Sequence, residues 1–285
     1  MEREGFWCGS IEYGVNYERS GLVQPEPTQE SYAARKTLRD ATAPVHLRDS
    51  FKDSGSQVVV KLANFHLTPE RPSYDGGTWH IEGQLNEHIC ALALLYYACD
   101  NITDSYLAFR ERIDENELTT GARNGYDSGY EQSEYMNMEQ LFGVTQHESS
   151  AIQDLGHVLT KQGRLVVFPN VLQHRVEPFE LRDATKPGHR KILALFLVDP
   201  YIKIPSTAHV PPQQRQWWTD MIRGLDRVGA LPPELVENIA DQAGDSLMDM
   251  EEAKALRLEL MKERTAFVED VNKDYEAWKI SFCEH

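Results

Sequence analysis

The fold is decided by the stretch Gly188-His-Arg-Lys-Ile-Leu-Ala-Leu-Phe-Leu-Val-Asp199, in which a basic opening leads into a run of apolar residues. Such a run predicts a buried strand, here over 191–198. Similar β-branched or apolar segments occur at 56–67, 88–97 and 165–168, with turns between them. Several strands without alternating helices indicate two facing sheets, and the economical architecture is a double-stranded β-helix, or jelly roll.

The pattern changes from strand to helix after residue 204. Prolines open two short helices, at 211–224 and 231–240, and Asp249 with Glu252 forms a capping box before a longer helix. The longer helix carries an apolar stripe that is expected to pack on the outside of a sheet: Leu256, Leu260, Phe267, Val271 and Trp278. We therefore expect a mainly β protein with flanking helices: an N-terminal extension (1–50), a jelly-roll core (51–204) and a C-terminal helical region packed on the core (205–285).

Residues 110–140 interrupt the expected core with charged, glycine-rich and tyrosine-rich sequence. A loop of this length inside a compact domain is either a functional lid or a plain insertion, and the sequence leaves both open. If it is a lid, Tyr126, Tyr130 and Tyr135 are candidates to reach a substrate.

The segment Trp79-His-Ile-Glu82 carries two metal-ligand side chains one residue apart. On a strand, His80 and Glu82 point to the same face, about 7 Å apart. Most such pairs are surface accidents, but a further histidine would complete the 2-His-1-carboxylate triad of non-heme Fe(II) oxygenases. His174, which follows a buried-strand pattern and a Pro-Asn turn, is the best candidate.

Other histidines compete for the third ligand position. These are His88, His147, His157 and His189, and each is expected to be a hydrogen-bonded structural residue. Gln84, Asn86, Tyr96 and Tyr97 lie close enough in sequence to support the site, although the strand parity is not fixed.

Arg190 directly precedes the apolar strand expected at 191–198. Burying a guanidinium is costly unless it meets an anion in a bidentate pair. Arg190 therefore either caps the strand end in water or binds the distal carboxylate of a dicarboxylic cosubstrate. A hairpin over 175–189 is expected to bring Arg190 back alongside His174.

Three long motifs carry a resemblance to a known family. Residues 77–88, 163–176 and 186–200, with the tail segments 210–218 and 281–285, resemble the fungal family catalogued as a domain of unknown function, DUF4246. The resemblance runs from about Val58 to His285. The order His80-x-Glu82, His174, Arg190 also resembles the Fe(II)/2-oxoglutarate-dependent oxygenases.

The oxygenase resemblance implies a complete set of roles. His80, Glu82 and His174 would hold Fe(II), 2-oxoglutarate would chelate the metal, and Arg190 would bind its far carboxylate. Dioxygen would then hydroxylate a small molecule, such as an amino acid or a secondary-metabolite intermediate. Two departures affect this expectation: Glu82 stands where aspartate is commoner, and Ile192 stands where serine or threonine is frequent.

Composition limits the partners. A formal net charge of -16 argues against a nucleic-acid groove and against an anionic membrane surface. No signal peptide or membrane-length apolar run is present, and the four cysteines show no paired or zinc-binding spacing, so a cytoplasmic protein with free thiols is expected. Two other functions stay open: a cupin-type metal enzyme that does not use 2-oxoglutarate, and a non-catalytic binding module on the same fold.

Overall fold

The computed structural model describes residues 46–113, 151–210, 213–242, 247–277 and 279. The N-terminal extension up to residue 45 lies outside the described residues, as do most of the 110–140 insertion with its three tyrosines, and His147. These expectations therefore stay predictions.

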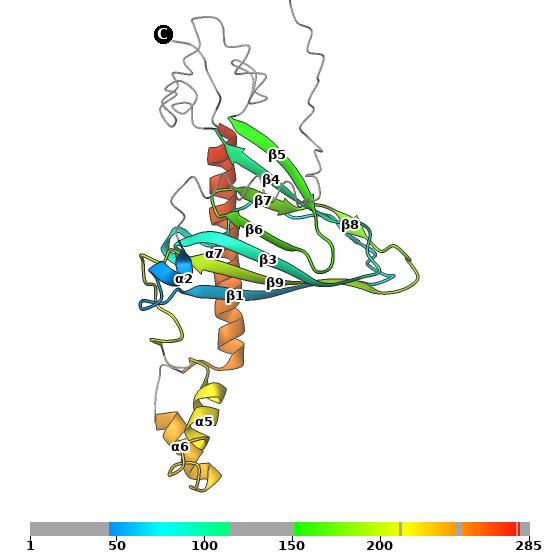
Figure 1. Cartoon of the computed structure of the whole chain (residues 1–285). Helices are drawn as coiled ribbons and strands as arrows, with labels where there is room; N and C mark the ends of the chain where they lie inside the picture. Colours follow the sequence, from blue (N-terminus) through cyan, green and yellow to red (C-terminus); the bar gives the residue numbers. More distant parts are fainter. Residues whose placement is uncertain (1–45, 114–150, 211–212, 243–246, 278, 280–285) are drawn as a thin grey trace, which may run out of the picture.

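The described residues form antiparallel sheets (Figure 1). A four-stranded sheet has the order β1-β9-β3-β6, a three-stranded sheet the order β5-β4-β7, and a small ribbon joins β2 to β8. The strands are β1 (Val58–Leu67), β2 (Ser73–Tyr74), β3 (Ile89–Asp100), β4 (Tyr106–Arg112), β5 (Ile152–Leu159), β6 (Leu165–Pro169), β7 (Gln173–Val176), β8 (Phe179–Glu180) and β9 (Gly188–Val198). The expected mainly β fold with a C-terminal helix is confirmed.

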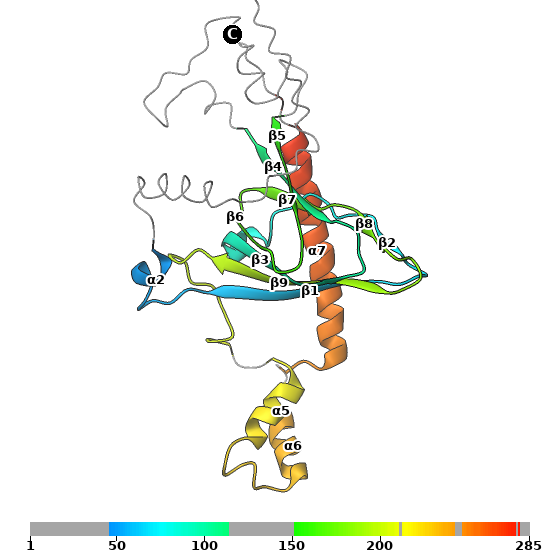
Figure 2. The ribbon, with the colours of Figure 1, turned by 45° about the vertical axis from the view of Figure 1, so that its right-hand side comes forward.

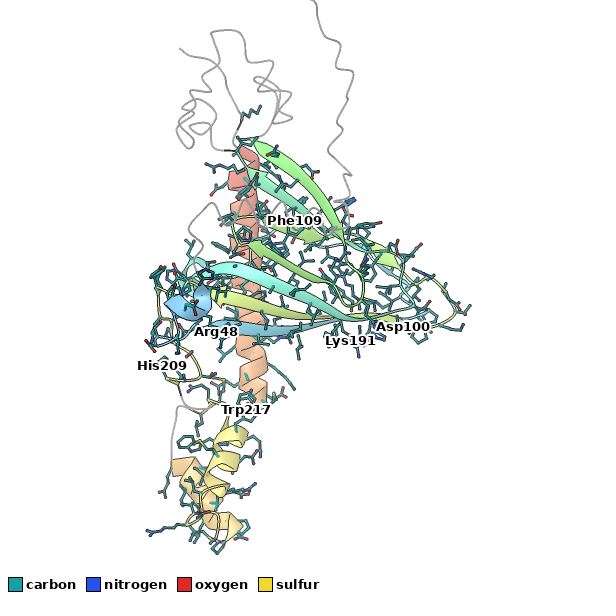
Figure 3. All side chains as sticks on the ribbon, in the orientation of Figure 1. Arg48, Asp100, Phe109, Lys191, His209 and Trp217 are labelled. Atoms are coloured by element: carbon teal, nitrogen blue, oxygen red, sulfur yellow. The ribbon has the colours of Figure 1, made fainter. Side chains whose placement is uncertain are left out.

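The core lies between the two larger sheets. Phe109 of β4 meets Phe168 of β6 edge to face, with ring centroids 4.9 Å apart. Leu92 of β3 and Phe196 of β9 belong to the same buried cluster. Figure 3 labels Phe109 on the smaller sheet, and Asp100 and Lys191 toward one end of the larger sheet.

The outer face of the four-stranded sheet is also apolar. Cross-strand pairing aligns two rows on this face, Val60–Leu195–Ala93–Val167 and Leu62–Leu193–Leu95–Leu165. Val60 is 62% exposed and Val167 is 65% exposed. Apolar residues on both faces explain why these strands read as continuous apolar runs in the sequence.

The C-terminal region is helical, as the proline, glycine and capping signals predicted. It contains α5 (Arg215–Arg223), α6 (Pro233–Gln242) and α7 (Met250–Ala277). The carboxylate of Asp249 accepts a hydrogen bond from the Glu252 N–H at 2.8 Å, which caps α7. The shorter elements α2 (Leu47–Ser50) and η1 (Leu85–Glu87) flank β1 and β3.

The long helix α7 runs past the sheets, whereas α5 and α6 lie together beyond its N-terminal end (Figure 2). The predicted packing of the α7 stripe is wrong for its first half, since Leu256 is 45% exposed and Leu260 is 43% exposed. Phe267 and Val271 are partly buried. None of the helices among the described residues is long and apolar enough to cross a membrane.

Two local predictions are wrong. Residues 79–82 form no strand, because only His80 makes a bridge, to His174, and Gly83 turns the chain with φ +75° directly after Glu82. The expected hairpin between His174 and Arg190 is absent as well. After β7 the chain leaves the three-stranded sheet through β8, and β9 enters the other sheet between β1 and β3.

Candidate metal centre

Three side chains converge between the sheets: His80, Glu82 and His174. Their ligand atoms all lie within 4.8 Å of one another. Glu82 Oε1 is 3.6 Å from His80 Nε2 and 3.8 Å from His174 Nε2. The backbones of the two histidines are joined by reciprocal hydrogen bonds of 3.1 and 3.0 Å. The arrangement could hold a metal ion.

Asn170 fixes the backbone that carries Glu82. Its Oδ1 accepts from the Glu82 N–H at 2.9 Å, and its Nδ2 donates to the Glu82 carbonyl at 2.8 Å. Nδ2 also donates to the Ile89 carbonyl at 2.9 Å. These bonds replace the strand pairing that residues 79–82 lack. The Pro-Asn turn marks the position of Asn170 in the sequence, but no local pattern indicates this role.

The helix α7 ties the two histidine-bearing segments together. Asn272 Nδ2 donates to the Trp79 carbonyl at 2.9 Å, and Asn272 Oδ1 accepts from Gln173 Nε2 at 3.0 Å. Arg110 Nε donates to Gln173 Oε1 at 2.6 Å, which completes the network. Trp79 and Gln173 directly precede His80 and His174. Asn272 therefore binds the residue before each histidine.

Trp79 is held between two cations. The guanidinium carbons of Arg110 and Arg175 lie 4.7 and 4.6 Å from the indole ring. Such contacts are stabilising because the face of an aromatic ring is electron-rich. Nearer the N-terminus of α7, Arg264 binds both carboxylate oxygens of Glu87, at 2.8 and 3.0 Å. The segment from Trp79 to Glu87 is therefore anchored to α7 at both ends.

Hydrogen bonding orients the first histidine. His80 Nδ1 lies 2.8 Å from the Thr78 carbonyl, which can only accept, so Nδ1 carries the proton of the neutral ring. Nε2 then presents its lone pair toward Glu82. Two acceptors that face each other at 3.6 Å repel unless a cation lies between them.

The pKa values of the cluster follow from burial and mutual charge. Burial alone would raise the pKa of Glu82, but the neighbouring imidazoles of His174 and His80 and the charge of Lys61 together outweigh it and hold that pKa far below its usual range. Burial would lower the pKa of His80, yet the Glu82 carboxylate raises it on balance. Burial dominates at His174, whose pKa is lowered. An ionised carboxylate and a neutral histidine are the protonation states that metal binding needs.

The donor set fits a divalent first-row metal. Two donors that are each about 2.1 Å from an ion and roughly at right angles are about 3.0 Å apart. The observed distances of 3.6 and 3.8 Å exceed this slightly, so an ion can enter with small side-chain movements. Two imidazoles and one carboxylate are the ligands that non-heme iron uses.

The three side chains line a cavity of about 180 Å³ between the sheets. Its walls are mostly apolar, with Leu94, Leu107 and Ile192 among them, and Tyr74 and Tyr96 supply hydroxyl-bearing rings. Lys61 of β1 also lines this cavity and is solvent-exposed.

Arg190 lies on the facing sheet, is 0% exposed, and therefore does not cap a strand end in water. Its Nη1 donates to Ser105 Oγ at 3.0 Å and to Thr160 Oγ1 at 3.4 Å. Within the described part of the chain, Nε and Nη2 have no hydrogen-bond partner. Burial lowers the pKa of Arg190, but a guanidinium stays charged in proteins. Among the described residues, Arg190 is thus a buried cation without a hydrogen-bonded anion.

Aromatic rings separate Arg190 from the cavity. Its guanidinium carbon lies 4.7 Å from the ring centre of Phe65, 4.6 Å from that of Phe179 and 5.6 Å from that of Tyr96. Phe65 and Tyr96 line the cavity, whereas Arg190 does not. The Tyr96 hydroxyl is buried without a partner among the described residues, and burial raises its pKa to about 12. Two donors without partners among the described residues therefore lie near the cavity: Tyr96 is part of its wall, and the Arg190 guanidinium lies behind the aromatic rings.

The hydroxyls beside Arg190 come from unexpected positions. Ile192, two residues after the arginine, lines the cavity and offers no polar group. Ser105 and Thr160 supply hydroxyls instead and are 2.6 Å apart. The two residues precede β4 and follow β5, so no local motif marked them.

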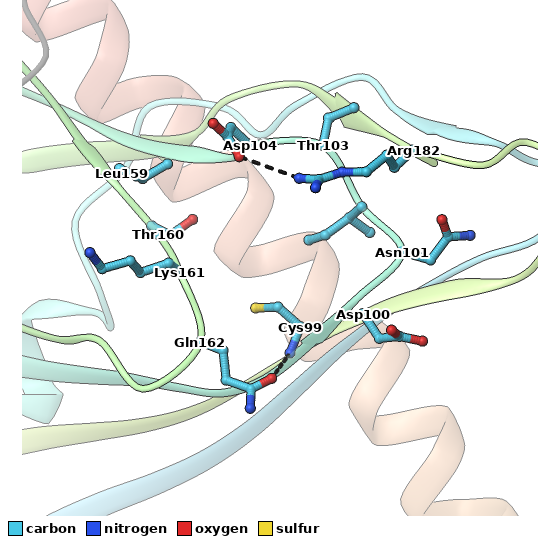
Figure 4. A pocket seen from close by; sticks show the side chains of 11 residues that line it. Cys99, Asp100, Asn101, Thr103, Asp104, Leu159, Thr160, Lys161, Gln162 and Arg182 are labelled. Atoms are coloured by element: carbon cyan, nitrogen blue, oxygen red, sulfur yellow. Dashed lines mark hydrogen bonds and ion pairs between the residues drawn. The ribbon is translucent and has the colours of Figure 1, made fainter.

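A larger cavity of about 390 Å³ contains none of the three candidate ligands (Figure 4). It is polar, with Asp104 and Arg182 paired at 3.6 Å and the Cys99 N–H bonded to Gln162 Oε1 at 3.1 Å. Cys99 also pairs with Arg190 across β3 and β9. This cavity is therefore not the metal site.

The other described histidines have separate surroundings. His157 Nδ1 lies 3.1 Å from Glu177 Oε1. His189 faces His66, with ring centres 6.2 Å apart. His88 takes a left-handed backbone conformation after η1. None of these three belongs to the group formed with Glu82.

The sequence matches a family model described as "Protein of unknown function (DUF4246)" over residues 10–221. The chain belongs to the DUF4246 family. The match begins well before Val58, where the sequence resemblance was expected to start, and it stops before the segment 281–285. No match is found among curated proteins.

Solved structures overlap only weakly with this DUF4246 protein. Protein NMB1881 from Neisseria meningitidis is 10% identical, with a TM-score of 0.20, over 61% of this chain and 99% of that chain. Hydroquinone 1,2-dioxygenase from Sphingomonas sp. TTNP3 is 10% identical, with a TM-score of 0.22, over 62% and 81%. A structure of tomato aspermy virus is 13% identical, with a TM-score of 0.22, over 65% and 100%. Similarity this low carries no argument about fold or function.

Proposed function

We propose that this protein is an Fe(II)/2-oxoglutarate-dependent oxygenase that oxidises a C–H bond of a small molecule. The observation that carries the proposal is the convergence of His80, Glu82 and His174 on one point inside a cavity. Two histidines and one carboxylate bind iron on one face and leave the other positions for cosubstrate and dioxygen.

We also propose that the facing antiparallel sheets are a double-stranded β-helix. Its core would span residues 51–204, with the helical region 205–285 against it. The support is the arrangement of the site: the proposed ligands lie between a four-stranded and a three-stranded sheet, and Arg190 comes from β9, one of the two inner strands of the larger sheet.

Each residue then has a defined task. Bound Fe(II) supplies the coupling of 2-oxoglutarate decarboxylation to substrate oxidation, with succinate, carbon dioxide and the hydroxylated product as outcome. His80, Glu82 and His174 hold the metal. The apolar walls of the cavity exclude water, which protects the reaction from side products.

Arg190 and Tyr96 are the proposed partners of the far carboxylate of 2-oxoglutarate. Both carry buried donors without partners among the described residues. A buried guanidinium without an anion is strongly disfavoured, and a carboxylate near the ring of Tyr96 would satisfy both groups. This role requires the carboxylate to pass between the rings that line the cavity, because Arg190 is enclosed by Phe65, Tyr96 and Phe179.

That enclosure supports a second candidate, a cupin-type metal enzyme that does not use 2-oxoglutarate. In this case the three ligands would hold a metal, and Arg190 would serve only to connect Ser105 and Thr160 on the facing sheet.

The deciding experiment is anaerobic titration of the Fe(II)-loaded protein with 2-oxoglutarate, followed by the visible charge-transfer absorption of the chelated keto acid. If the protein is a 2-oxoglutarate-dependent oxygenase, the wild type should show the absorption band and His174→Ala should lack it. Bound iron without a band would support the cupin-type enzyme. Failure to bind iron would support a non-catalytic module.

A further inference from the structure

Lys61 is the one lysine or arginine that lines the cavity within the described part of the chain. It lies on β1 and pairs directly with Ala194 of β9. Ala194 is buried and lines the same cavity. Because directly paired residues of antiparallel strands point to the same face, the Lys61 side chain leaves the backbone on the cavity side of the sheet.

The surroundings of Lys61 differ from those of other exposed lysines. Lys186, Lys254 and Lys273 each pair with a nearby carboxylate, at 2.7 to 3.2 Å. Lys61 has no ion pair or hydrogen bond in the part of the chain that the structure describes; its Nζ lies 6.0 Å from the centre of the Phe196 ring. Glu82 lines the same cavity, but its carboxylate faces the two histidines and forms no ion pair with Lys61 among the described residues, so the ammonium is available for a ligand.

The Lys61 side chain and the candidate metal ligands are on the same side of the sheet, because all four residues line one cavity. Arg190 pairs with Phe65, four residues from Lys61 on β1. At about 3.3 Å per residue, the two cations leave the sheet about 13 Å apart.

The size of the cavity indicates that Arg190 and Lys61 contact different molecules. Its volume of about 180 Å³ is below the range of about 300–1,000 Å³ that drug-sized ligands occupy, so it accommodates one small molecule. Under the proposed function that molecule is 2-oxoglutarate, directed toward the buried Arg190. The substrate then approaches the metal from the solvent side, where Lys61 is exposed.

We propose that Lys61 binds a carboxylate of the substrate, so that the substrate is a small organic acid. This assignment rests on the proposed function, since it needs 2-oxoglutarate to fill the inner cavity. A single ammonium is a compact point charge and suits one carboxylate through a charge-assisted hydrogen bond. Lys61 is thus a specificity-determining residue, distinct from the metal ligands and from Arg190.

The test adds second ligands to the anaerobic complex of protein, Fe(II) and 2-oxoglutarate, and follows the change in its charge-transfer band. The probes are the L-amino acids and the straight-chain monocarboxylic acids, each beside its primary amide. We expect at least one acid to bind about tenfold more tightly than its amide, because loss of the charge-assisted bond costs about one order of magnitude. Lys61→Met should remove this preference, and Lys61→Arg should retain it.

Lys191→Met is the matched control, since Lys191 pairs with Asn64 on the same two strands but points away from the cavity. It should keep the full preference for acids. Equal binding of acids and amides by the wild type, or an unchanged preference in Lys61→Met, overturns the proposal. Weaker 2-oxoglutarate binding in Lys61→Met also overturns it, because Lys61 would then hold the cosubstrate. Absence of the band in the wild type rejects the proposed function itself, and the substrate assignment with it.

Discussion

His174 and Arg190 lie on facing sheets, and the chain fixes them in different ways. The region around His80, Glu82 and His174, here called the histidine end, is made of short, irregular segments. Hydrogen bonds of the side chains of Asn170, Gln173 and Asn272 hold these segments together. The region around Arg190, here called the arginine end, is part of β9, an inner strand that pairs along its length with β1 and β3. The first end depends on a few hydrogen bonds, and the second on strand register.

The two ends also differ in how their charges are satisfied. The carboxylate of Glu82 has two histidine neighbours, whereas the guanidinium of Arg190 has hydroxyls and aromatic rings but no anion in the part of the chain that the structure describes. The histidine end is therefore ready for a cation and the arginine end for an anion. In the ligand-free protein, strand pairing fixes the arginine, and two hydroxyls and three aromatic rings contact its guanidinium. The variants below separate the two ends.

The largest effect is expected from His174→Ala, which removes one of the three proposed metal ligands. Removal of a residue that merely supports a ligand lowers metal affinity by about 10–100-fold, so loss of the ligand itself should exceed about 100-fold. Metal content after equilibrium dialysis against Fe(II) or Co(II) measures this. His189→Ala is the control and should bind metal like the wild type. Equal metal content in His174→Ala would exclude the three-ligand centre.

Arg190→Met should change cosubstrate binding and stability in opposite directions. Loss of the cation should weaken 2-oxoglutarate binding by about 30–100-fold, since a buried charge pair contributes about 2–3 kcal/mol or more. Removal of an uncompensated buried charge should raise the free energy of unfolding of the ligand-free protein by about 1–3 kcal/mol. Cosubstrate titration and urea unfolding measure the two quantities.

Arg182→Met is the control for Arg190→Met, because Arg182 is exposed and forms a long ion pair with Asp104. It should alter neither quantity. A loss of stability in Arg190→Met, without a change in cosubstrate affinity, would make Arg190 a purely structural residue.

Asn272→Ala should lower metal affinity by about tenfold and leave 2-oxoglutarate binding to the metal-loaded protein nearly unchanged. Its side chain holds the backbone before His80 and the Gln173 side chain before His174, and both are at the histidine end. Metal competition with a chromophoric chelator measures the change. Lys273→Ala, on the exposed side of α7, is the matched control. If Asn272→Ala binds metal as tightly as the control, α7 does not position the ligands.

The smallest effect concerns Tyr96 and alkaline pH. The pKa of Tyr96 is raised from 10.0 to about 12 by burial, with the charge of Arg190 acting in the opposite direction. A raised pKa contributes stability that is complete below about pH 10 and is lost as the pH rises toward 12. One pH unit in this interval costs about 1.4 kcal/mol.

Unfolding in urea at about pH 9 and about pH 11 measures this loss, with the pH values chosen on either side of the ordinary tyrosine pKa. The wild type should lose about 1 kcal/mol more than Tyr96→Phe between the two conditions. Tyr97→Phe, at a position that is 42% exposed, should behave like the wild type. Parallel losses in the wild type and Tyr96→Phe would contradict the assignment.

The difference between the two ends explains what the sequence could predict. The strand of Arg190 was predictable because seven apolar residues follow each other from Ile192 to Val198 and local composition suffices. The helices after residue 204 were also predictable, because proline, glycine and the capping residue Asp249 mark helix ends within a few residues of themselves. His80 and Glu82 were found because their spacing is a property of one segment.

Long-range partners were not predictable. The hairpin between His174 and Arg190 was expected because their segments are close in the sequence, but β8 leads the chain to the other sheet. Ser105, Thr160, Asn170 and Asn272 are ordinary polar residues by local pattern. Their roles depend on contacts with residues 30 to 193 positions away.

The two hydrogen bonds of Asn272, which tether the segments of both histidines to α7, can form only late in protein synthesis. Asn272 follows Gln173 by 99 residues and Trp79 by 193 residues. At about 5–20 residues per second, a ribosome needs roughly 5–20 s to pass from the second histidine to this tether. During that interval both histidines have been made but their backbones lack the Asn272 bridge. Under the proposed function, metal loading is therefore expected to follow the synthesis of α7.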